Sequence, residues 1–221
     1  MGRENKKEAV AALHREHILT AAQELFSERG FEQTTIDDIS KKSEYSRRTV
    51  YAYFDSKDDI MHHIIESGLI ELKNETEKAL RDNDEFMEQY NAVCTAMRNY
   101  QKRCPQSFES VQSAKNPDFS GGYVSDTVKR IFALGEEING MLAEFIEKGK
   151  RSGTVRQDVE PMMSVYVIWA SISSLISLAE TKGRFISEQF AVSVDDFLEY
   201  GFRQIINSIL AVRSPHGLIT L

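Results

Sequence analysis

The sequence has few of the features that mark membrane, secreted or disulfide-stabilised proteins. It contains two cysteines, Cys94 and Cys104, and their spacing in a region of helical periodicity favours free thiols in a reducing cytoplasm over a disulfide framework. No run reaches about eighteen uninterrupted apolar residues, because serines interrupt the most apolar segment, 165–178. The first residues, 1–8, are charged and lack the apolar centre of a signal peptide. These absences predict a cytoplasmic protein without a membrane span.

Positive charge is also scarce. The formal net charge is -7 at pH 7, whereas proteins that hold DNA by bulk charge are usually basic. Residues 1–63 contain ten Lys and Arg against twelve Asp and Glu, so the N-terminal end is not basic either. Any binding to DNA must therefore depend on where the cations lie. Six of the ten lie in two groups, with Arg3, Lys6 and Lys7 at the start of the chain and Arg47, Arg48 and Lys57 around one short helix.

Motifs of catalysis are absent as well. The chain has no glycine-rich phosphate loop, nucleophile elbow or paired-carboxylate arrangement. His14 and His17 lie three positions apart and could share a helix face, but no carboxylate or cysteine nearby completes a metal site. A solvated or half-buried structural role is favoured for them. We therefore expect a protein that is not an enzyme and that holds no metal or cofactor.

Helical periodicity runs through nearly the whole chain, and no alternating strand pattern is convincing. In the first helix, Ile18, Ala22, Leu25 and Phe26 form one apolar face, and Gly30 ends the helix. The pattern predicts an all-α fold of about nine helices. Their expected ranges are about 7–29, 35–43, 46–54, 57–80, 85–103, 108–114, 125–150, 161–183 and 194–212.

The second and third of these helices are short and joined by a tight turn, which is the form of a DNA-reading helix-turn-helix. Val50 and Phe54 are four positions apart and are expected to pack inward, leaving Arg47, Arg48, Thr49 and Tyr51 outside. Arginine can bond a guanine edge with two hydrogen bonds, and a threonine methyl can contact thymine. The alternative is an ordinary surface helix that happens to carry two arginines and a tyrosine.

Three segments resemble a known family. They are 18–31 (ILTAAQELFSERGF), 34–39 (TTIDDI) and 49–57 (TVYAYFDSK), and in this order they are similar to the N-terminal domain of TetR-family (tetracycline-repressor-like) regulators. The resemblance implies an all-helical homodimer with a three-helix DNA-binding domain, residues 1–56. Residues 57–221 would form a larger helical domain that binds a ligand and dimerises, with the helix at about 57–80 as connector.

The resemblance also implies the residues that contact DNA. The positions that correspond to the family's usual contacts are Thr35, Arg47, Arg48, Thr49, Tyr51, Tyr53 and Lys57, and we add the helix-capping Ser46 to this predicted interface. One residue departs from the pattern, because Glu44 stands where the family usually has glycine. Glycine tolerates a positive φ that glutamate resists, and a carboxylate is unfavourable near phosphates.

The last two predicted helices are candidates for a dimer interface. Both carry broad apolar stripes, and packing them against their copies would give a four-helix interface with twofold symmetry. The alternative is that they fill the core of a monomer. The residues predicted to form the interface are Trp169, Ile172, Ile176, Phe197, Gly201, Phe202, Ile205 and Ile209.

An effector pocket is expected in the C-terminal domain, although each aromatic or sulfur-bearing candidate is by itself more typical of plain core. The candidates are Met97, Tyr100, Phe108, Phe132, Tyr166 and Trp169, with Phe119 and Tyr123 considered beside them. Apolar walls suit a small, largely apolar molecule. The predicted function is that of a transcriptional repressor that such an effector releases from a palindromic operator on double-stranded DNA. The alternative function is a helical protein-interaction adaptor without sequence-specific DNA binding.

Overall fold

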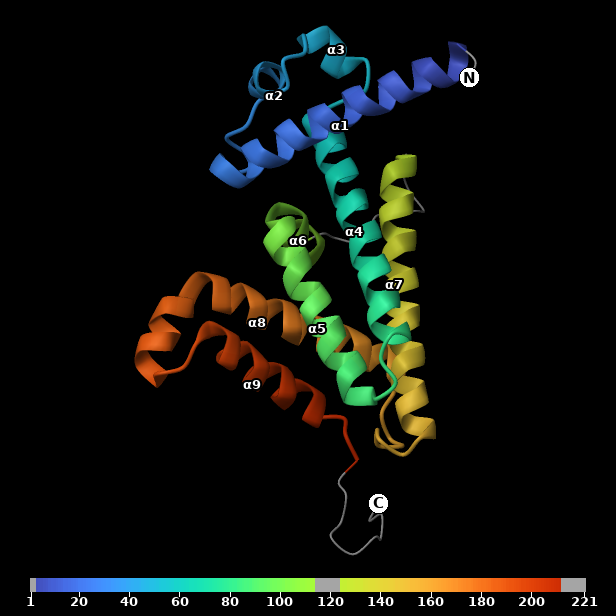
Figure 1. Cartoon of the computed structure of the whole chain (residues 1–221), viewed down its shortest axis with the longest axis vertical. Helices are drawn as coiled ribbons and strands as arrows, with labels where there is room; N and C mark the ends of the chain where they lie inside the picture. Colours follow the sequence, from blue (N-terminus) through green and yellow to red (C-terminus); the bar gives the residue numbers. More distant parts are fainter. Residues whose placement is uncertain (1–2, 114–123, 212–221) are drawn as a thin grey trace, which may run out of the picture. The chain divides into compact units, whose positions relative to one another are not determined.

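The computed structural model describes residues 3–113 and 124–211, and over these ranges the fold is all-α, as predicted (Figure 1). No strand occurs in the described ranges, where one isolated β-bridge joins Val155 and Leu210. The helices are α1 (Arg3–Arg29), α2 (Ile36–Lys42), α3 (Arg47–Tyr51), α4 (Lys57–Arg81), α5 (Phe86–Arg103), α6 (Pro105–Ser113), α7 (Asp126–Arg151), α8 (Pro161–Phe190) and α9 (Val194–Asn207).

The chain forms two compact units. Unit 1 consists of Met1–Glu71 and Tyr100–Ala133, and unit 2 consists of Leu72–Asn99 and Leu134–Leu221. Helices α4, α5 and α7 each contribute residues to both units. The predicted functional division, with DNA binding in residues 1–56 and ligand binding and dimerisation in residues 57–221, stays a prediction.

Unit 1 is built on α1, which packs against α2 and α6, while α2 packs against α3 (Figure 1). The predicted inner face of α1 is confirmed, since Ile18 and Phe26 are completely buried. Gly30 ends α1 with a φ of 85°, a conformation that glycine adopts without steric cost. Val50 and Phe54 are also buried, so the third helix directs its apolar side inward as expected.

Several helix ends differ from the predicted ones. Helix α3 ends at Tyr51 rather than near residue 54, and α6 begins at Pro105, where proline suits the first turn. Helix α8 continues past Gly183 to Phe190, and α9 ends at Asn207; residue 212, the predicted end of α9, lies outside the described ranges. Gly183 does not end α8, because glycine is required there by the packing of α8 against α9. A Cβ at position 183 would lie 2.9 Å from Val194 Cγ2, which only glycine avoids.

In unit 2, α8 and α9 pack side by side as a helical hairpin. Ala191 ends α8 in the left-handed conformation, with a φ of 53°. Among the described residues, α8 is the one helix long and apolar enough to cross a membrane, judged by length and composition alone. The interrupting serines therefore do not remove this property, and 28% of its most apolar window is buried. Such an apolar, little-covered helix indicates a surface that another apolar surface could cover.

The two cysteines are free and buried, in agreement with the prediction of free thiols. Burial raises the pKa of the Cys94 thiol to about 12. The thiol therefore stays protonated and packs as a small apolar group.

Candidate DNA interface and ligand cavity

The start of α2 is fixed by a capping box. Thr35 Oγ1 accepts a hydrogen bond from the Asp38 backbone N–H at 3.2 Å, and the Asp38 carboxylate accepts one from the Thr35 backbone N–H at 3.0 Å. The Thr35 hydroxyl also donates to this carboxylate at 2.6 Å. These hydrogen bonds, with the nearby Arg29 guanidinium, lower the pKa of the Asp38 carboxyl. The predicted contact Thr35 is exposed, but its hydroxyl already has a role in the helix cap.

Helix α3 has a simpler cap. Ser46 Oγ accepts the Thr49 backbone N–H at 3.1 Å, and the two hydroxyl oxygens lie 2.8 Å apart. Because the Thr49 hydroxyl is engaged in this way, its methyl group is the part suited to contact a thymine methyl. The cap fixes the N-terminal turn of α3, from which a recognition helix contacts base edges.

The two arginines of α3 differ in their surroundings. Arg47 pairs with Asp37 of α2, with 3.0 Å between Nε and Oδ1. Arg48 is exposed and forms no ion pair with any residue in the described part of the chain. Tyr51 is exposed as well. Exposed ion pairs contribute about 0–1 kcal/mol, so Arg47 can exchange Asp37 for a base or phosphate at little cost.

The turn between α2 and α3 keeps a left-handed residue although glycine is absent. Glu44 has a φ of 61°, a conformation that costs a residue with a Cβ about 1–2 kcal/mol. Ser40 Oγ donates to the Tyr45 carbonyl at 2.6 Å, and the Glu44 N–H donates to the Lys41 carbonyl at 3.3 Å. The turn thus has the geometry that glycine would give, and these hydrogen bonds help to hold it.

Lys57, the first residue of α4, makes contacts within unit 1. Its Nζ donates to the Phe31 carbonyl at 2.7 Å and lies 4.1 Å from the centre of the Phe31 ring. The side chain therefore ties α4 to the segment that follows α1. A phosphate contact by Lys57 stays a prediction, and it would have to share or replace these interactions.

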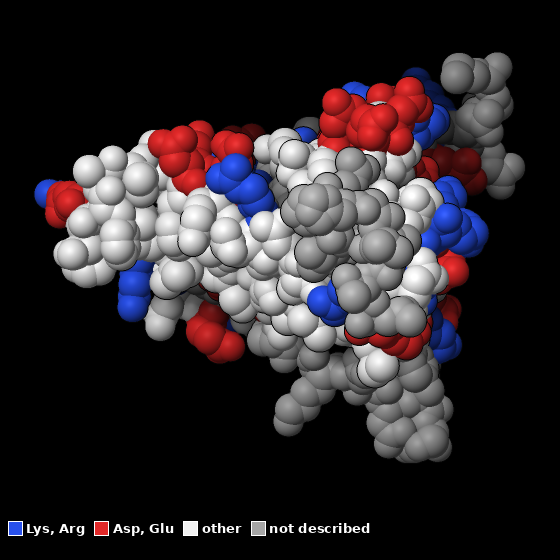
Figure 2. All heavy atoms as spheres, turned by 90° about the horizontal axis from the view of Figure 1, so that it is seen from below, with Lys and Arg blue, Asp and Glu red and all other residues white. Residues whose placement is uncertain are grey.

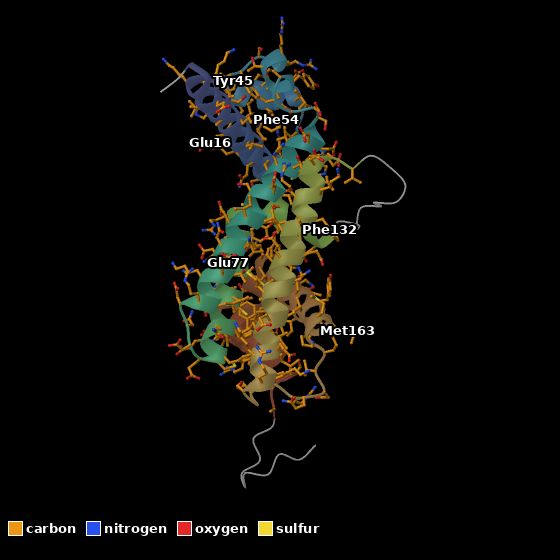
Figure 3. All side chains as sticks on the ribbon, turned by 90° about the vertical axis from the view of Figure 1, so that its right-hand side faces the viewer. Glu16, Tyr45, Phe54, Glu77, Phe132 and Met163 are labelled. Carbon is orange, nitrogen blue, oxygen red and sulfur yellow. The ribbon has the colours of Figure 1, made fainter. Side chains whose placement is uncertain are left out.

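A cluster of histidines and tyrosines that the sequence did not reveal joins α1 to the two ends of α3. Tyr45 precedes α3 and lies beside α1 (Figure 3), where its hydroxyl lies 3.2 Å from His17 Nδ1. Tyr53 follows α3, and its hydroxyl lies 3.0 Å from His14 Nδ1. The spacing of four between His14 and the buried Ile18 was a signal that this histidine faces the interior. The cluster fixes α3 against α1.

Unit 2 contains a small apolar cavity of about 30 Å³. Its walls are Tyr90, Val93, Met97, Leu142, Phe145, Ile146, Val165, Ile168, Trp169, Ile172 and Ile206. The Tyr90 hydroxyl donates to the Phe202 carbonyl at 2.8 Å, and burial raises the pKa of this phenol, so it stays neutral. The cavity presents no charge.

Two of the predicted pocket residues, Met97 and Trp169, line this cavity. The others lie elsewhere in the structure. Tyr100 and Phe108 are buried in unit 1, where their rings pack edge to face. Phe132 and Tyr166 are exposed, at 37% and 56% (Figure 3 labels Phe132). Phe119 and Tyr123 lie outside the described residues.

Some residues of the predicted dimer interface face inward in the structure. Ile172, Ile176 and Ile209 are buried within unit 2, and the open side of Gly201 contacts Leu175 of the neighbouring α8. These four positions pack within the chain, which agrees with the alternative interpretation that the two helices fill the core of a monomer. Trp169, Phe197, Phe202 and Ile205 are partly exposed.

Helix α8 instead exposes a different apolar stripe. Met163, Val167, Leu178 and Phe185 lie 4, 11 and 7 positions apart, which places them on one side of a helix. Val167 is 64% exposed and Phe185 is 62% exposed. Figure 2 shows that the surface over the α8–α9 end of unit 2 is predominantly uncharged in that view.

The chain is similar to known transcriptional regulators in sequence and in fold. The sequence model of the family described as "Bacterial regulatory proteins, tetR family" matches residues 18–64, which include α2 and α3. The chain is 26% identical to the HTH-type transcriptional repressor NicS of Pseudomonas putida over 182 residues, 82% of each protein. Its fold is similar to that of the MbdR regulator of Azoarcus sp. CIB, with a TM-score of 0.66 and 20% identity over 94% of this chain and 100% of MbdR. It is also similar to the regulator FadR of Bacillus subtilis in complex with stearoyl-CoA, with a TM-score of 0.67 and 15% identity over 88% of this chain and 98% of FadR.

Proposed function

Because this chain belongs to the TetR family of helix-turn-helix transcriptional regulators, we propose that it acts in the cytoplasm as a homodimeric repressor. It binds a palindromic operator through α3, and a small, largely apolar effector that binds in unit 2 releases it. Repression agrees with the similarity to the repressor NicS. The observation that carries the proposal is the exposed, capped α3 with Arg47 and Arg48 at its first two positions.

DNA recognition is assigned to these two arginines. They lie in the first turn of α3, where a recognition helix meets base edges in the major groove, and arginine bonds a guanine through two parallel hydrogen bonds. Thr35, Tyr53 and Lys57 contact phosphates and set the orientation of α3. Bulk charge contributes little, because the chain is acidic overall.

The effector is assigned to the cavity of unit 2. No charged side chain belongs to its described walls, so the ligand that it favours is uncharged where the cavity holds it. About 30 Å³ is far below the roughly 300–1,000 Å³ of a typical ligand site. Binding therefore has to move wall side chains, and this movement is what couples the effector to a change in the protein. The similarly folded FadR was solved in complex with stearoyl-CoA, whose acyl chain is an example of an apolar ligand group.

The dimer is assigned to the exposed stripe of α8 together with the partly exposed residues of α9. A second copy related by a twofold axis would bury Val167 and Phe185, which water surrounds in the single chain. Two α3 helices about one DNA turn apart then contact the two halves of a palindrome. An effector that favours a conformation in which the two α3 helices are differently spaced lowers DNA affinity, because it shifts the population away from the conformation that binds DNA.

Selection of DNA tests the proposal. The wild-type protein is used to enrich duplexes from a random-sequence pool, and binding of the enriched duplex is measured by gel shift over a range of salt concentrations. We expect an enriched palindromic sequence whose affinity falls as salt rises, because bound phosphates release counterions. Arg81→Ala, a charge change on an exposed residue at the end of α4, is the control and should bind as the wild type does. Failure to enrich any sequence, with a folded protein, would contradict the proposal.

A further inference from the structure

The contact between His14 and Tyr53 joins a titratable side chain to a predicted phosphate contact. His14 Nδ1 lies 3.0 Å from the Tyr53 hydroxyl oxygen, and the two rings meet edge to face with centres 5.8 Å apart. Tyr53 also lines an open groove together with Lys6 and Lys7 of α1. A phosphate in this groove would meet two ammonium groups and the tyrosine hydroxyl.

The direction of this hydrogen bond depends on the tautomer and on the protonation of His14. A phenol has one proton to donate. When His14 is neutral with its proton on Nε2, Nδ1 accepts a hydrogen bond from the hydroxyl of Tyr53. When His14 is an imidazolium, Nδ1 donates, so the hydroxyl oxygen accepts and its own proton is free for a phosphate oxygen. Tyr53 then makes a charge-assisted hydrogen bond, the stronger kind.

We propose that His14 is a positioning residue that makes DNA binding proton-linked, through the direction of its hydrogen bond with Tyr53. The inference rests on the proposed DNA-binding function. Binding of a phosphate at Tyr53 favours the imidazolium form of His14, because the phosphate accepts a hydrogen bond from the freed Tyr53 hydroxyl and attracts the positive charge. By linkage, a lower pH then increases DNA affinity, and DNA binding takes up a proton.

The surroundings of the pair are consistent with an anionic ligand. From α1 it is faced by Arg15, whose guanidinium carbon lies 5.8 Å from the centre of the Tyr53 ring, and the groove adds Lys6, Lys7 and Glu8. From the segment before α3 it is faced by Tyr45, whose ring centre lies 4.8 Å from that of His14, and Tyr45 in turn contacts His17. The one carboxylate in this set is Glu8.

The test compares wild-type protein with H14N at about pH 8 and about pH 6, the range in which histidine ordinarily changes charge. Asparagine can donate an N–H to the Tyr53 hydroxyl and does not titrate. The probe is the duplex enriched by the wild-type protein. We expect the wild-type Kd to fall between pH 8 and pH 6 by about fivefold more than the H14N Kd, the size of one ordinary hydrogen bond. Calorimetry in two buffers of different ionisation enthalpy should find proton uptake on binding that H14N lacks.

His17→Asn is the matched control. His17 lies on the same helix and contacts a tyrosine hydroxyl in the same way, but its partner Tyr45 is not a predicted DNA contact. The H17N variant should keep the wild-type change of Kd with pH. A loss of this change in H17N equal to that in H14N would assign the effect to general packing of the cluster and overturn the proposal.

The remaining outcomes are also distinguishable. Equal pH dependence of wild type and H14N overturns the role of His14 and leaves the DNA-binding function standing. If the wild type binds no enriched duplex at either pH, the DNA-binding function itself fails. Should circular dichroism show that H14N is unfolded, Tyr53→Phe decides, since it removes the hydroxyl and should lose the same pH-dependent gain. A Y53F protein with the wild-type pH dependence would contradict the proposal.

Discussion

The predicted DNA face of unit 1 and the α8 stripe of unit 2 expose different kinds of side chain. In unit 1, Arg47 pairs with Asp37, and the Thr35 hydroxyl caps α2, so these polar groups have partners that they can exchange for DNA. In unit 2, Val167 and Phe185 are large, apolar and exposed. Only another apolar surface removes them from water. Unit 1 therefore suits a polyanion that binds reversibly, whereas unit 2 suits a permanent partner, which we propose is a second copy.

The largest expected effect comes from a charge placed on the α8 stripe. Val167→Asp should leave the folded single chain nearly unchanged, because the residue is exposed there. In the dimer it would bury an unpaired carboxylate in each copy, at a cost of several kcal/mol. The dimer dissociation constant, measured by analytical ultracentrifugation, should rise by more than about a hundredfold.

A matched control places the same charge elsewhere in unit 2. Asn91→Asp adds one carboxylate on an exposed part of α5 that carries no apolar stripe, and it should leave dimerisation unchanged. If V167D and N91D dimerise equally well, the α8 stripe is not the dimer interface, and the proposal that it binds a second copy is contradicted.

The two capping boxes permit a direct comparison of the units. Thr35 caps α2 in unit 1, and Ser193 caps α9 in unit 2 with the same pattern of hydrogen bonds. Thr35→Ala and Ser193→Ala should each lower the free energy of unfolding by about 1 kcal/mol, as N-cap losses do. DNA affinity should fall in T35A alone, since Thr35 is a predicted phosphate contact. Equal gel-shift affinities of the two variants would remove Thr35 from the interface.

Removing the backbone strain of the turn should have a smaller effect. Glu44→Gly relieves the positive φ but gives the unfolded chain more freedom, so the net gain in stability should be about 1 kcal/mol or less. Removing the carboxylate should also strengthen DNA binding slightly. A lower midpoint of thermal unfolding in E44G would show that the glutamate makes a contact that outweighs the strain.

The capping boxes also predict an acid dependence. The hydrogen bonds from Thr35 to Asp38 and from Ser193 to Asp196 lower the pKa of both carboxyls below the ordinary 3.8. The stabilisation of the folded protein by these carboxylates is therefore fully present above pH 3.8, the ordinary pKa, and is lost as the pH falls through the lowered pKa. Stability measured against pH by chemical denaturation should drop less steeply in T35A and S193A in this acid range. The same slope in the wild type and in both variants would contradict this.

Local patterns predicted most of the fold. The apolar face at Ile18 and Phe26, the end of α1 at Gly30 and the inward side of α3 follow from spacing and residue type, which depend on neighbours in sequence. Helix ends were harder to predict where a residue type, such as glycine, occurs both at helix ends and at close contacts between helices. Gly183 resembles a helix end, but it is glycine because Val194 packs against it. Ala191 occupies the left-handed position where glycine is commoner.

The sites were less accessible to sequence reasoning, because they depend on contacts between distant positions. The residues of α3 could be named from a motif, but His14 and Tyr53 are 39 positions apart and no local pattern joins them. The cavity shows the same limit. Periodicity identifies buried residues such as Met97 and Tyr100 alike, yet only the packing of helices puts Met97 in a cavity wall and Tyr100 in a separate core.

The most direct test of recognition by α3 is the affinity of wild type, Arg47→Ala and Arg48→Ala for the enriched duplex and for versions with each guanine replaced. For the arginine that contacts a guanine, we predict a loss of about 1–3 kcal/mol and an indifference to replacement of that guanine. Arg48 should show the larger loss, because Arg47 gives up its pairing with Asp37 when it binds. Wild-type affinity and wild-type base preference in both variants would contradict the assignment of α3 as the helix that reads the operator.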